Sequence, residues 1–128
     1  MEIIIRDKIY VNGEWIPSTG TGTIDVINPA TEEVMGRIPD GTAEDVDRAA
    51  RAAAVAFPGW SQSPLEERVK FIRKIAAGIQ TRIPEIAALI AREVGMPVKL
   101  AARVQAGLPF ATFSSIPDVV GMVKWEER

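Results

Sequence analysis

Residues 23–38 read TIDVINPATEEVMGRI, and this stretch shows how the first third of the chain folds. A β-branched run from Thr23 to Ile27 leads into the turn formers Asn28-Pro29-Ala30-Thr31, and a second apolar run follows from Val34 to Ile38. Proline disfavours helix in the residue before it, so an Asn-Pro step favours a change from extended chain to turn. We therefore predict a β-hairpin over these residues.

A second hairpin is predicted upstream. Lys8 to Val11 and Glu14 to Ile16 are strand-like, and Asn12-Gly13 between them tolerates the positive φ that a type I′ turn requires. The glycine-rich stretch Ser18–Gly22 precedes a strand and not a helix. It lacks the helix N-terminus that would hold a phosphate, and we predict a loop there.

The composition changes near residue 42, where alanine, leucine, isoleucine and alternating charges take over. We predict a helix from about Ala43 to Phe57, with Thr42 as N-cap, acidic residues in the first turn and Pro58-Gly59 as the stop. The residues at helical spacing, which we expect to form one buried face, are Val46, Ala50, Ala53 and Phe57.

A second helix is predicted to begin at Ser63-Pro64-Leu65-Glu66, which supplies an N-cap serine, a proline at the first helical position and a capping-box glutamate. A third should start near Pro84 and end at Gly95, a good residue to follow a helix. The apolar stripes expected on these two helices are Leu65, Val69, Ile72, Ala76 and Ile79, then Ile83, Ala87, Ile90 and Val94.

A fourth helix is predicted from Val98 to about Ala106, because Gly107 and Pro109 should kink or end it. Leu100, Val104 and Leu108 would share one face. The alternation in Val123 to Glu126 suits an edge strand. The fold class expected is α+β, with two hairpins in residues 1–41, about four helices in 42–120 and the start of a strand for assembly in 121–128.

Composition excludes several functions. The chain has 128 residues, is 47 % apolar and 25 % charged, and has the size of one globular domain. Its net charge of −2 argues against binding to nucleic acid or an anionic membrane. It contains no cysteine and no histidine, which excludes disulfides, a thiolate nucleophile, an imidazole base and metal ligation through either residue. No catalytic residue is therefore predicted.

Neither a secretory signal nor an apolar run long enough to cross a bilayer is present, so we expect a cytoplasmic protein. Among the carboxylates, Glu93 stands apart, because it lies at the end of an amphipathic helix just before a Gly-x-Pro break. Periodicity alone leaves two interpretations of Glu93 open: a solvated charge at a helix end, or a ligand for a bound group.

Several motifs together resemble the aldehyde dehydrogenase superfamily. YVNGEW at residues 10–15 looks like its opening hairpin, and VINPATEEV at 26–34 is similar to its "NPATGE" hairpin. TAEDVDRA at 42–49 and AFPGWS at 56–61 match its first helix and the tryptophan after it. REVGMP at 92–97 corresponds to the "E-x-G-K-P" element, with Met96 in place of the usual lysine. The resemblance covers roughly residues 8 to 128 in order.

The resemblance implies that the chain is the N-terminal part of the α/β cofactor-binding domain of a longer enzyme. Such an enzyme oxidises aldehydes to acids with NAD or NADP, through a thiohemiacetal on a cysteine. The catalytic and nucleotide-binding residues of the family lie beyond this segment, so the chain alone should be inactive and should not bind the cofactor.

Two features of the family map onto residues present here. The resemblance implies a monovalent cation, Na⁺ or K⁺, held by the backbone carbonyls of Val26 and Ile27 and the carboxylate of Glu93, and oxygen ligands suit a hard cation. It also implies a helix lining the substrate entrance, where the candidate residues are Gln105, Leu108 and Thr112.

The expected partners are the remainder of the enzyme or other subunits, and we expect the isolated chain to self-associate. An alternative is a free-standing, non-catalytic helical module that binds a partner protein. A third interpretation, an α+β domain with an accidental family likeness, does not explain five motifs in the family order.

Overall fold

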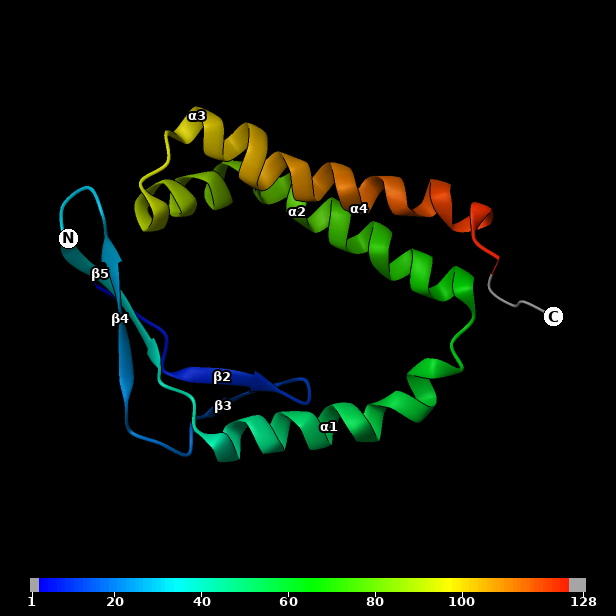
Figure 1. Cartoon of the computed structure of the whole chain (residues 1–128), viewed down its shortest axis with the longest axis horizontal. Helices are drawn as coiled ribbons and strands as arrows, with labels where there is room; N and C mark the ends of the chain where they lie inside the picture. Colours follow the sequence, from blue (N-terminus) through cyan, green and yellow to red (C-terminus); the bar gives the residue numbers. More distant parts are fainter. Residues whose placement is uncertain (1–2, 125–128) are drawn as a thin grey trace. The chain divides into compact units, whose positions relative to one another are not determined.

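The computed structural model describes residues 3–124 (Figure 1). The chain forms two compact units, Met1–Gln62 and Ser63–Arg128, and each is described by itself. The boundary lies after the first long helix, which therefore belongs with the strands. The change of composition near residue 42 does not mark it.

The first predicted hairpin is confirmed. Strands β2 (Lys8–Val11) and β3 (Glu14–Pro17) pair antiparallel, and Val11 is opposite Glu14. The two turn residues both have positive φ, 53° at Asn12 and 85° at Gly13, as a type I′ turn requires.

The second hairpin is also confirmed, and it is part of a three-stranded sheet. Strands β4 (Thr23–Asn28) and β5 (Glu33–Pro39) pair antiparallel, while the short strand β1 (Ile4–Ile5) adds parallel to β5. Strand β1 carries no signal in the local sequence pattern and was not predicted. At Gly36 a Cβ would lie 3.1 Å from the carbonyl oxygen of Ile4, so the residue's small size lets the two strands approach.

The turn between β4 and β5 forms around Asn28. Its side-chain oxygen accepts a hydrogen bond from the Ala30 N–H at 2.9 Å, and its carbonyl accepts one from the Glu32 N–H at 2.7 Å. Glu32 has a φ of 59°, in the left-handed region that favours glycine. It stands where the "NPATGE" pattern has its glycine.

Helix α1 (Ala43–Ser61) begins as predicted, with Thr42 as its N-cap. Two expectations about it are wrong. Pro58 does not stop the helix, because it lies in the last turn and removes one backbone donor only. The face expected to be buried is open instead, with Val46 68 % and Phe57 66 % exposed, because the strands of the first unit contact little of α1.

Helix α2 (Leu65–Val94) joins the second and third predicted helices into one. Pro84 lies inside it and does not start a new helix, because the apolar stripe facing α4 continues on both sides. The N-cap is Pro64 without a side-chain cap, so Ser63 does not cap this helix as predicted. Gly95 ends it in the left-handed conformation, φ 71°, as expected. The inward residues are Leu65, Val69, Ile72, Ala76, Ile79, Ile83, Ala87 and Ile90, whereas Val94 is 64 % exposed.

The helical run after Pro97 passes through Gly107 and Pro109, contrary to prediction. It consists of α3 (Val98–Leu100), the π-helix η1 (Ala101–Ala106), α4 (Gly107–Val119) and the 3₁₀-helix η2 (Val120–Met122). Pro109 is tolerated because it lies in the first turn of α4, where a backbone N–H has no partner within the helix.

The second unit is a helix pair, in which α2 contacts both η1 and α4 along its length (Figure 1). The face predicted to be shared by Leu100, Val104 and Leu108 points outward, with 46 %, 39 % and 60 % exposed. Ala101 and Ala106 face α2 in their place, because small side chains let the two helices approach closely.

The predicted strand over Val123 to Glu126 falls partly outside the described residues, which end at Lys124. Val123 and Lys124 lie in no strand, and the residues just before them are helical. No helix among residues 3–124 is long and apolar enough to span a membrane.

Candidate functional site

The residues predicted to bind a cation divide between the two units. Val26 and Ile27 lie on β4 in the first unit, and Glu93 lies exposed in the last turn of α2 in the second. The cation site therefore stays a prediction. Within residues 3–124 no group of three or more acidic side chains gathers to hold a metal.

The backbone near Val26 and Ile27 has one unusual feature. Val26 pairs with Gly36 and Ile27 with Val34, so Met35 on β5 is an extra residue with no partner in the ladder. Such a β-bulge locally disrupts the ladder hydrogen bonds and commonly lies beside functional sites. Sequence patterns gave no sign of the bulge, because Met35 continues the apolar run of the strand.

The three residues predicted to line a substrate entrance are all exposed. Gln105 lies in the π-helix η1, while Leu108 and Thr112 lie one turn apart on α4. Leu108 has 60 % of its surface exposed. The structure thus brings Leu108 and Thr112 onto one open face of a helix.

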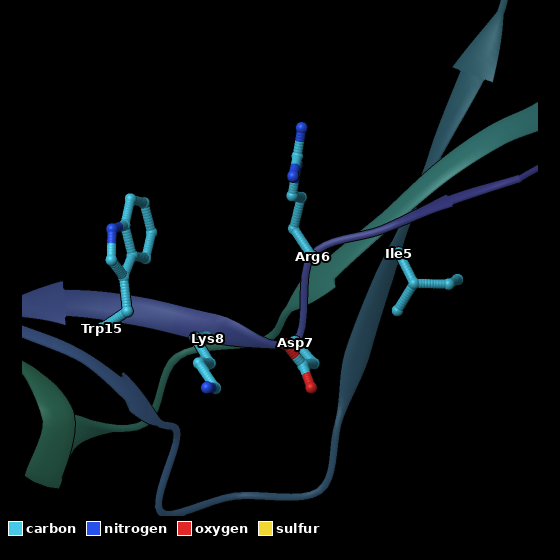
Figure 2. A pocket seen from close by; sticks show the side chains of 5 residues that line it. All are labelled: Ile5, Arg6, Asp7, Lys8 and Trp15. Atoms are coloured by element: carbon cyan, nitrogen blue, oxygen red, sulfur yellow. The ribbon is translucent and has the colours of Figure 1, made fainter.

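A recess of ≈ 630 Å³ lies in the first unit beside the hairpin β2–β3 (Figure 2). Ile5, Arg6, Asp7, Lys8 and Trp15 line it. Arg6 and Trp15 extend to the same side of the backbone in Figure 2. Trp15 is 65 % exposed and contacts Tyr10, with the ring centres 5.2 Å apart. The charged groups of this lining are Arg6, Asp7 and Lys8, and it includes no serine, threonine or cysteine.

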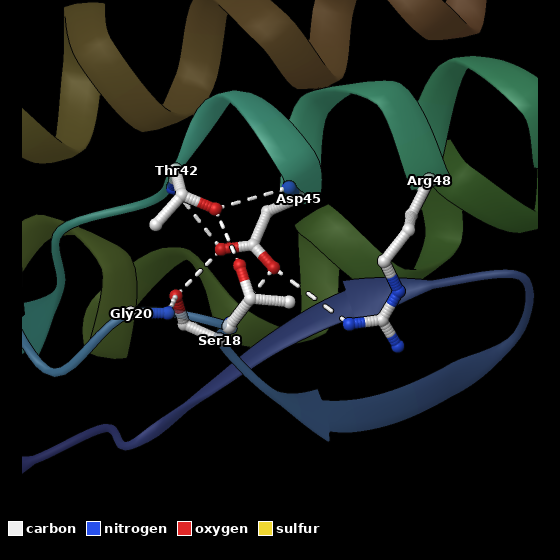
Figure 3. A network of polar contacts seen from close by, with 6 residues as sticks. Ser18, Gly20, Thr42, Asp45 and Arg48 are labelled. Atoms are coloured by element: carbon white, nitrogen blue, oxygen red, sulfur yellow. Dashed lines mark hydrogen bonds and ion pairs between the residues drawn. The ribbon is translucent and has the colours of Figure 1, made fainter.

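The carboxylate of Asp45, in the first turn of α1, takes part in a network of polar contacts (Figure 3). One oxygen accepts hydrogen bonds from the Ser18 hydroxyl at 2.5 Å and the Thr42 N–H at 3.1 Å. The other accepts one from the Thr19 N–H at 3.0 Å. The Arg48 guanidinium lies 3.7 Å away, and Asp45 is only 4 % exposed.

These contacts hold the carboxylate in its ionised form. The Ser18 hydroxyl and the Thr42 N–H stabilise the negative charge most, so the pKa of Asp45 lies far below its ordinary value of 3.8. Thr42 completes a capping box, because its hydroxyl accepts from the Asp45 N–H at 3.2 Å. Asp45 therefore fastens the loop after β3 to the start of α1.

The contacts of Asp45 also determine whether the glycine-rich loop Ser18–Gly22 could hold the phosphate of a dinucleotide. The loop does lie at a helix N-terminus, that of α1, which its position in the sequence did not reveal. The donors there already bind the carboxylate of Asp45, and a Cβ at Gly20 would lie 2.7 Å from the Thr42 methyl carbon. The loop therefore does not fit a phosphate group, and we assign no cofactor to it.

Sequence reasoning placed Asp45 in the first turn of a helix but missed its contacts with Ser18 and Thr19, which lie more than 25 residues away. One signal was available. A threonine followed three residues later by an acidic side chain indicates a reciprocal cap. Ser18 and Thr19 have no comparable sequence pattern that links them to Asp45.

The chain is similar to solved structures of one class of enzyme. It superposes on aldehyde dehydrogenase from Bartonella henselae with a TM-score of 0.94 at 28 % identity, covering 98 % of this chain and 26 % of that one. It superposes on aldehyde dehydrogenase C from Pseudomonas syringae, solved as a C291A mutant with NAD⁺ and octanal, with a TM-score of 0.91 at 34 % identity. That match covers 95 % of this chain and 25 % of the other.

The sequence comparisons agree. Residues 15–124 match the model of the aldehyde dehydrogenase family, and the chain belongs to this family. It is 46 % identical over 101 residues to lactaldehyde dehydrogenase of Escherichia coli K12, a match that covers 79 % of this chain and 21 % of that enzyme. The chain thus spans about a quarter of the length of the relatives it matches.

Proposed function

We propose that these 128 residues are the N-terminal part of an NAD(P)-dependent aldehyde dehydrogenase, which oxidises an aldehyde to a carboxylic acid. In this proposal they serve as scaffold, and the remainder of the enzyme supplies the cysteine nucleophile and the nucleotide site. The observation that carries the proposal is the open apolar surface of the helices in a chain that belongs to this family.

That surface is extensive on α1. Val46 and Phe57, which helix periodicity places on one packing face, are 68 % and 66 % exposed. Val55, on the other side of the helix, is 82 % exposed. Covering a large aliphatic or aromatic side chain is worth about 1.5–3 kcal/mol. The remainder of a dehydrogenase is the partner that family membership supplies for these faces.

The chemistry of the chain supports a scaffold role. It contains no cysteine, so it supplies no thiolate, and no histidine, so it supplies no imidazole base. The donors at the start of α1 already bind Asp45. The purified 128-residue chain should therefore show no NAD(P)-coupled turnover of short aldehydes, and turnover dependent on it would overturn the proposal.

A chimera tests whether residues 1–128 serve as the scaffold of an active enzyme. Residues 1–128 would replace the matching segment of Escherichia coli lactaldehyde dehydrogenase, with the same enzyme lacking that segment as control. We expect aldehyde-dependent reduction of NAD⁺ by the chimera and none by the control. Should the fusion fail to fold, the separate 128-residue chain is added to the deleted enzyme, and activity should appear on mixing. Inactivity in both formats would refute the scaffold role.

We further propose that Val26, Ile27 and Glu93 contribute oxygen ligands to a monovalent cation in the complete enzyme. The bulge at Met35 supports the backbone part, because it disturbs the ladder beside the two carbonyls. In the active chimera, K⁺ or Na⁺ should raise the melting temperature more than it does in the Glu93→Gln variant. An equal rise in both would exclude Glu93 as a ligand.

The entrance role of Gln105, Leu108 and Thr112 is likewise part of the proposal. All three residues lie exposed on η1 and α4, and membership of the aldehyde dehydrogenase family supports the entrance role.

A further inference from the structure

The recess beside the hairpin β2–β3 has the size of a small-molecule site. Its volume of ≈ 630 Å³ lies within the range of about 300–1,000 Å³ in which proteins bind small ligands. Two of its lining residues, Ile5 and Trp15, are large and apolar, and they are 56 % and 65 % exposed. A flat apolar group that entered the recess would cover surface that now contacts water, which favours binding.

Arg6 supplies the recess with a cation that has no partner among residues 3–124. Its backbone is fixed, because its N–H donates to the Arg37 carbonyl at 2.9 Å and so extends the pairing of β1 with β5. Its guanidinium makes no hydrogen bond or ion pair with any of these residues. A guanidinium offers five N–H donors in a planar fork that matches a carboxylate. The other arginines of the first unit each pair with an aspartate: Arg37 with Asp25, Arg48 with Asp45 and Arg51 with Asp47.

The charges around the recess favour a ligand with one negative charge. Two cations, Arg6 and Lys8, and one anion, Asp7, give the lining a net charge of +1. Figure 2 shows Arg6 and Trp15 extending to one side of the backbone and Asp7 and Lys8 to the other, so the Asp7 carboxylate does not occupy the guanidinium. A carboxylate carries one negative charge at pH 7, whereas a phosphate monoester carries about 1.5–2. The lining therefore favours a carboxylate.

Trp15 is the residue against which an aromatic ring would pack. It lies directly opposite Tyr10 in the hairpin, and the two ring centres are 5.2 Å apart with the rings tilted by 59°. This cross-strand contact holds the indole while leaving most of it open to solvent. Aromatic rings attract one another in offset or tilted contacts beyond the area that they bury. The recess thus joins a side chain that binds rings to one that binds anions.

We propose that this recess binds an aromatic carboxylate, whose carboxylate group accepts hydrogen bonds from the Arg6 guanidinium and whose ring packs against the Trp15 indole. The ligand class follows from the two side chains together. An acid without a ring would use Arg6 alone, and a neutral ring would use Trp15 alone. The inference goes beyond the scaffold role and does not depend on it, because both residues belong to the first unit.

Naphthoate is the probe, and saturation-transfer NMR measures its binding to the 128-residue chain. A ligand of this size in an open recess should bind with a Kd of about 1 mM. Arg6→Gln should weaken binding about tenfold, because it removes the charge-assisted hydrogen bonds. Trp15→Leu should weaken it severalfold. The Arg6 side chain makes no hydrogen bond or ion pair within residues 3–124, so its replacement leaves the fold intact, and unchanged binding by Arg6→Gln would overturn the proposal.

Lys74→Gln is the matched control for loss of one positive charge. Lys74 also lies beside an aromatic side chain, with its ammonium 5.6 Å from the centre of the Phe71 ring, but it belongs to the second unit. This variant should bind naphthoate as the parent chain does. Equal weakening by Lys74→Gln and Arg6→Gln would show that the probe responds to net charge and not to the recess, and the proposal would fail.

Three further probes test the ligand class. Naphthylmethanol keeps the ring without the charge, acetate keeps the carboxylate without the ring, and naphthyl phosphate carries the larger charge. We expect the first two to bind at least tenfold more weakly than naphthoate, and the phosphate to bind no more tightly. Equal binding of naphthylmethanol would exclude a role for Arg6, and tighter binding of the phosphate would overturn the assignment to carboxylates.

The same titrations on the chimera separate this inference from the scaffold role. An active chimera that does not bind naphthoate in an Arg6-dependent manner overturns this inference and leaves the scaffold role intact. Arg6-dependent binding by the 128-residue chain, combined with inactivity of the chimera and of the mixed proteins, overturns the scaffold role alone. Should the 128-residue chain precipitate at the concentrations that NMR requires, the titrations on the chimera decide.

Discussion

The two units of the chain differ in the kind of residue that is buried inside each of them. In the second unit, the buried residues among those described are all alanines: Ala76, Ala87, Ala101 and Ala106. In the first unit they include a single large apolar side chain, Met35, beside two polar ones, Asn28 and Asp45. The helix pair therefore depends on close approach between backbones, whereas the strands and loops depend on hydrogen bonds to specific groups.

This difference has consequences for substitution. Close helix packing does not tolerate added volume, since extra methylene groups force the helices apart. A polar network tolerates a change in size better than the loss of a partner, because a buried donor left without an acceptor is costly.

The largest effect on stability is expected from enlarging a buried alanine. Ala101 is 0 % exposed against α2, and Ala101→Leu should lower the free energy of unfolding by about 1–3 kcal/mol. The matched control is Ala88→Leu, which adds the same atoms at an exposed position of α2. Urea unfolding followed by circular dichroism measures both. Equal effects at the two positions would show that close packing is not what holds the second unit.

The next effect is expected at Asp45, in the first unit. Asp45→Asn replaces an acceptor by an NH₂ group facing the Ser18 hydroxyl and two backbone N–H groups, so the variant should be less stable at pH 7. The pKa of Asp45 is lowered in the folded state. Its stabilisation is therefore present above the ordinary value of 3.8 and is lost as the pH falls below it towards the folded value.

The difference in stability between the parent chain and Asp45→Asn should thus narrow as the pH is lowered below 3.8. Asp47→Asn is the control, since Asp47 lies on the same helix in an exposed ion pair with Arg51. If the difference in unfolding free energy between the parent chain and Asp45→Asn stays constant from pH 7 to acid, the ionised carboxylate is not the source of the stability.

Sequence patterns predicted the local features that a few neighbouring residues determine. The type I′ turn at Asn12-Gly13, the cap at Thr42 and the helix end at Gly95 are all confirmed, because each depends on the φ or the hydrogen bonds of adjacent residues. Of the predicted site residues, Gln105, Leu108 and Thr112 lie exposed on η1 and α4, and their entrance role stays a prediction.

Features that depend on distant contacts were missed. The continuity of α2 through Pro84 follows from packing along α4, which the local cost of proline does not reveal. The π turn was missed because a period of 3.6 residues was assumed throughout. The strand β1 was missed because its partner lies some 30 residues away.

A smaller effect, of opposite sign, is expected in the turn of the first unit. Glu32 adopts a φ of 59°, which costs a non-glycine residue about 1–2 kcal/mol. Glu32→Gly should therefore stabilise the chain by about 1 kcal/mol, after allowance for the greater freedom of glycine in the unfolded state. Glu33→Gly, one residue later in β5, should destabilise it. Thermal unfolding compares the two, and destabilisation by both would contradict the strain assigned to Glu32.

The smallest effect is expected from the ion pair between Arg82 and Glu85, which flanks Pro84 in α2. The guanidinium donates to both carboxylate oxygens, at 2.8 and 2.6 Å, but the two side chains are 62 % and 64 % exposed. The hydrogen bond from Arg82 lowers the pKa of Glu85, so any contribution is present above its ordinary value of 4.5 and is lost in acid. Solvent screens an exposed pair strongly.

Glu85→Gln should accordingly change the stability of the second unit slightly at low salt and not measurably at high salt. This result would assign the continuity of α2 through Pro84 to its contact with α4, because the apolar stripe remains intact in the variant. Hydrogen exchange of the amides after residue 84 provides the direct measurement. If Glu85→Gln accelerates their exchange while the amides before residue 80 stay protected, the ion pair is what carries the helix past the proline. The second unit would then depend on a specific polar contact, as the first unit does.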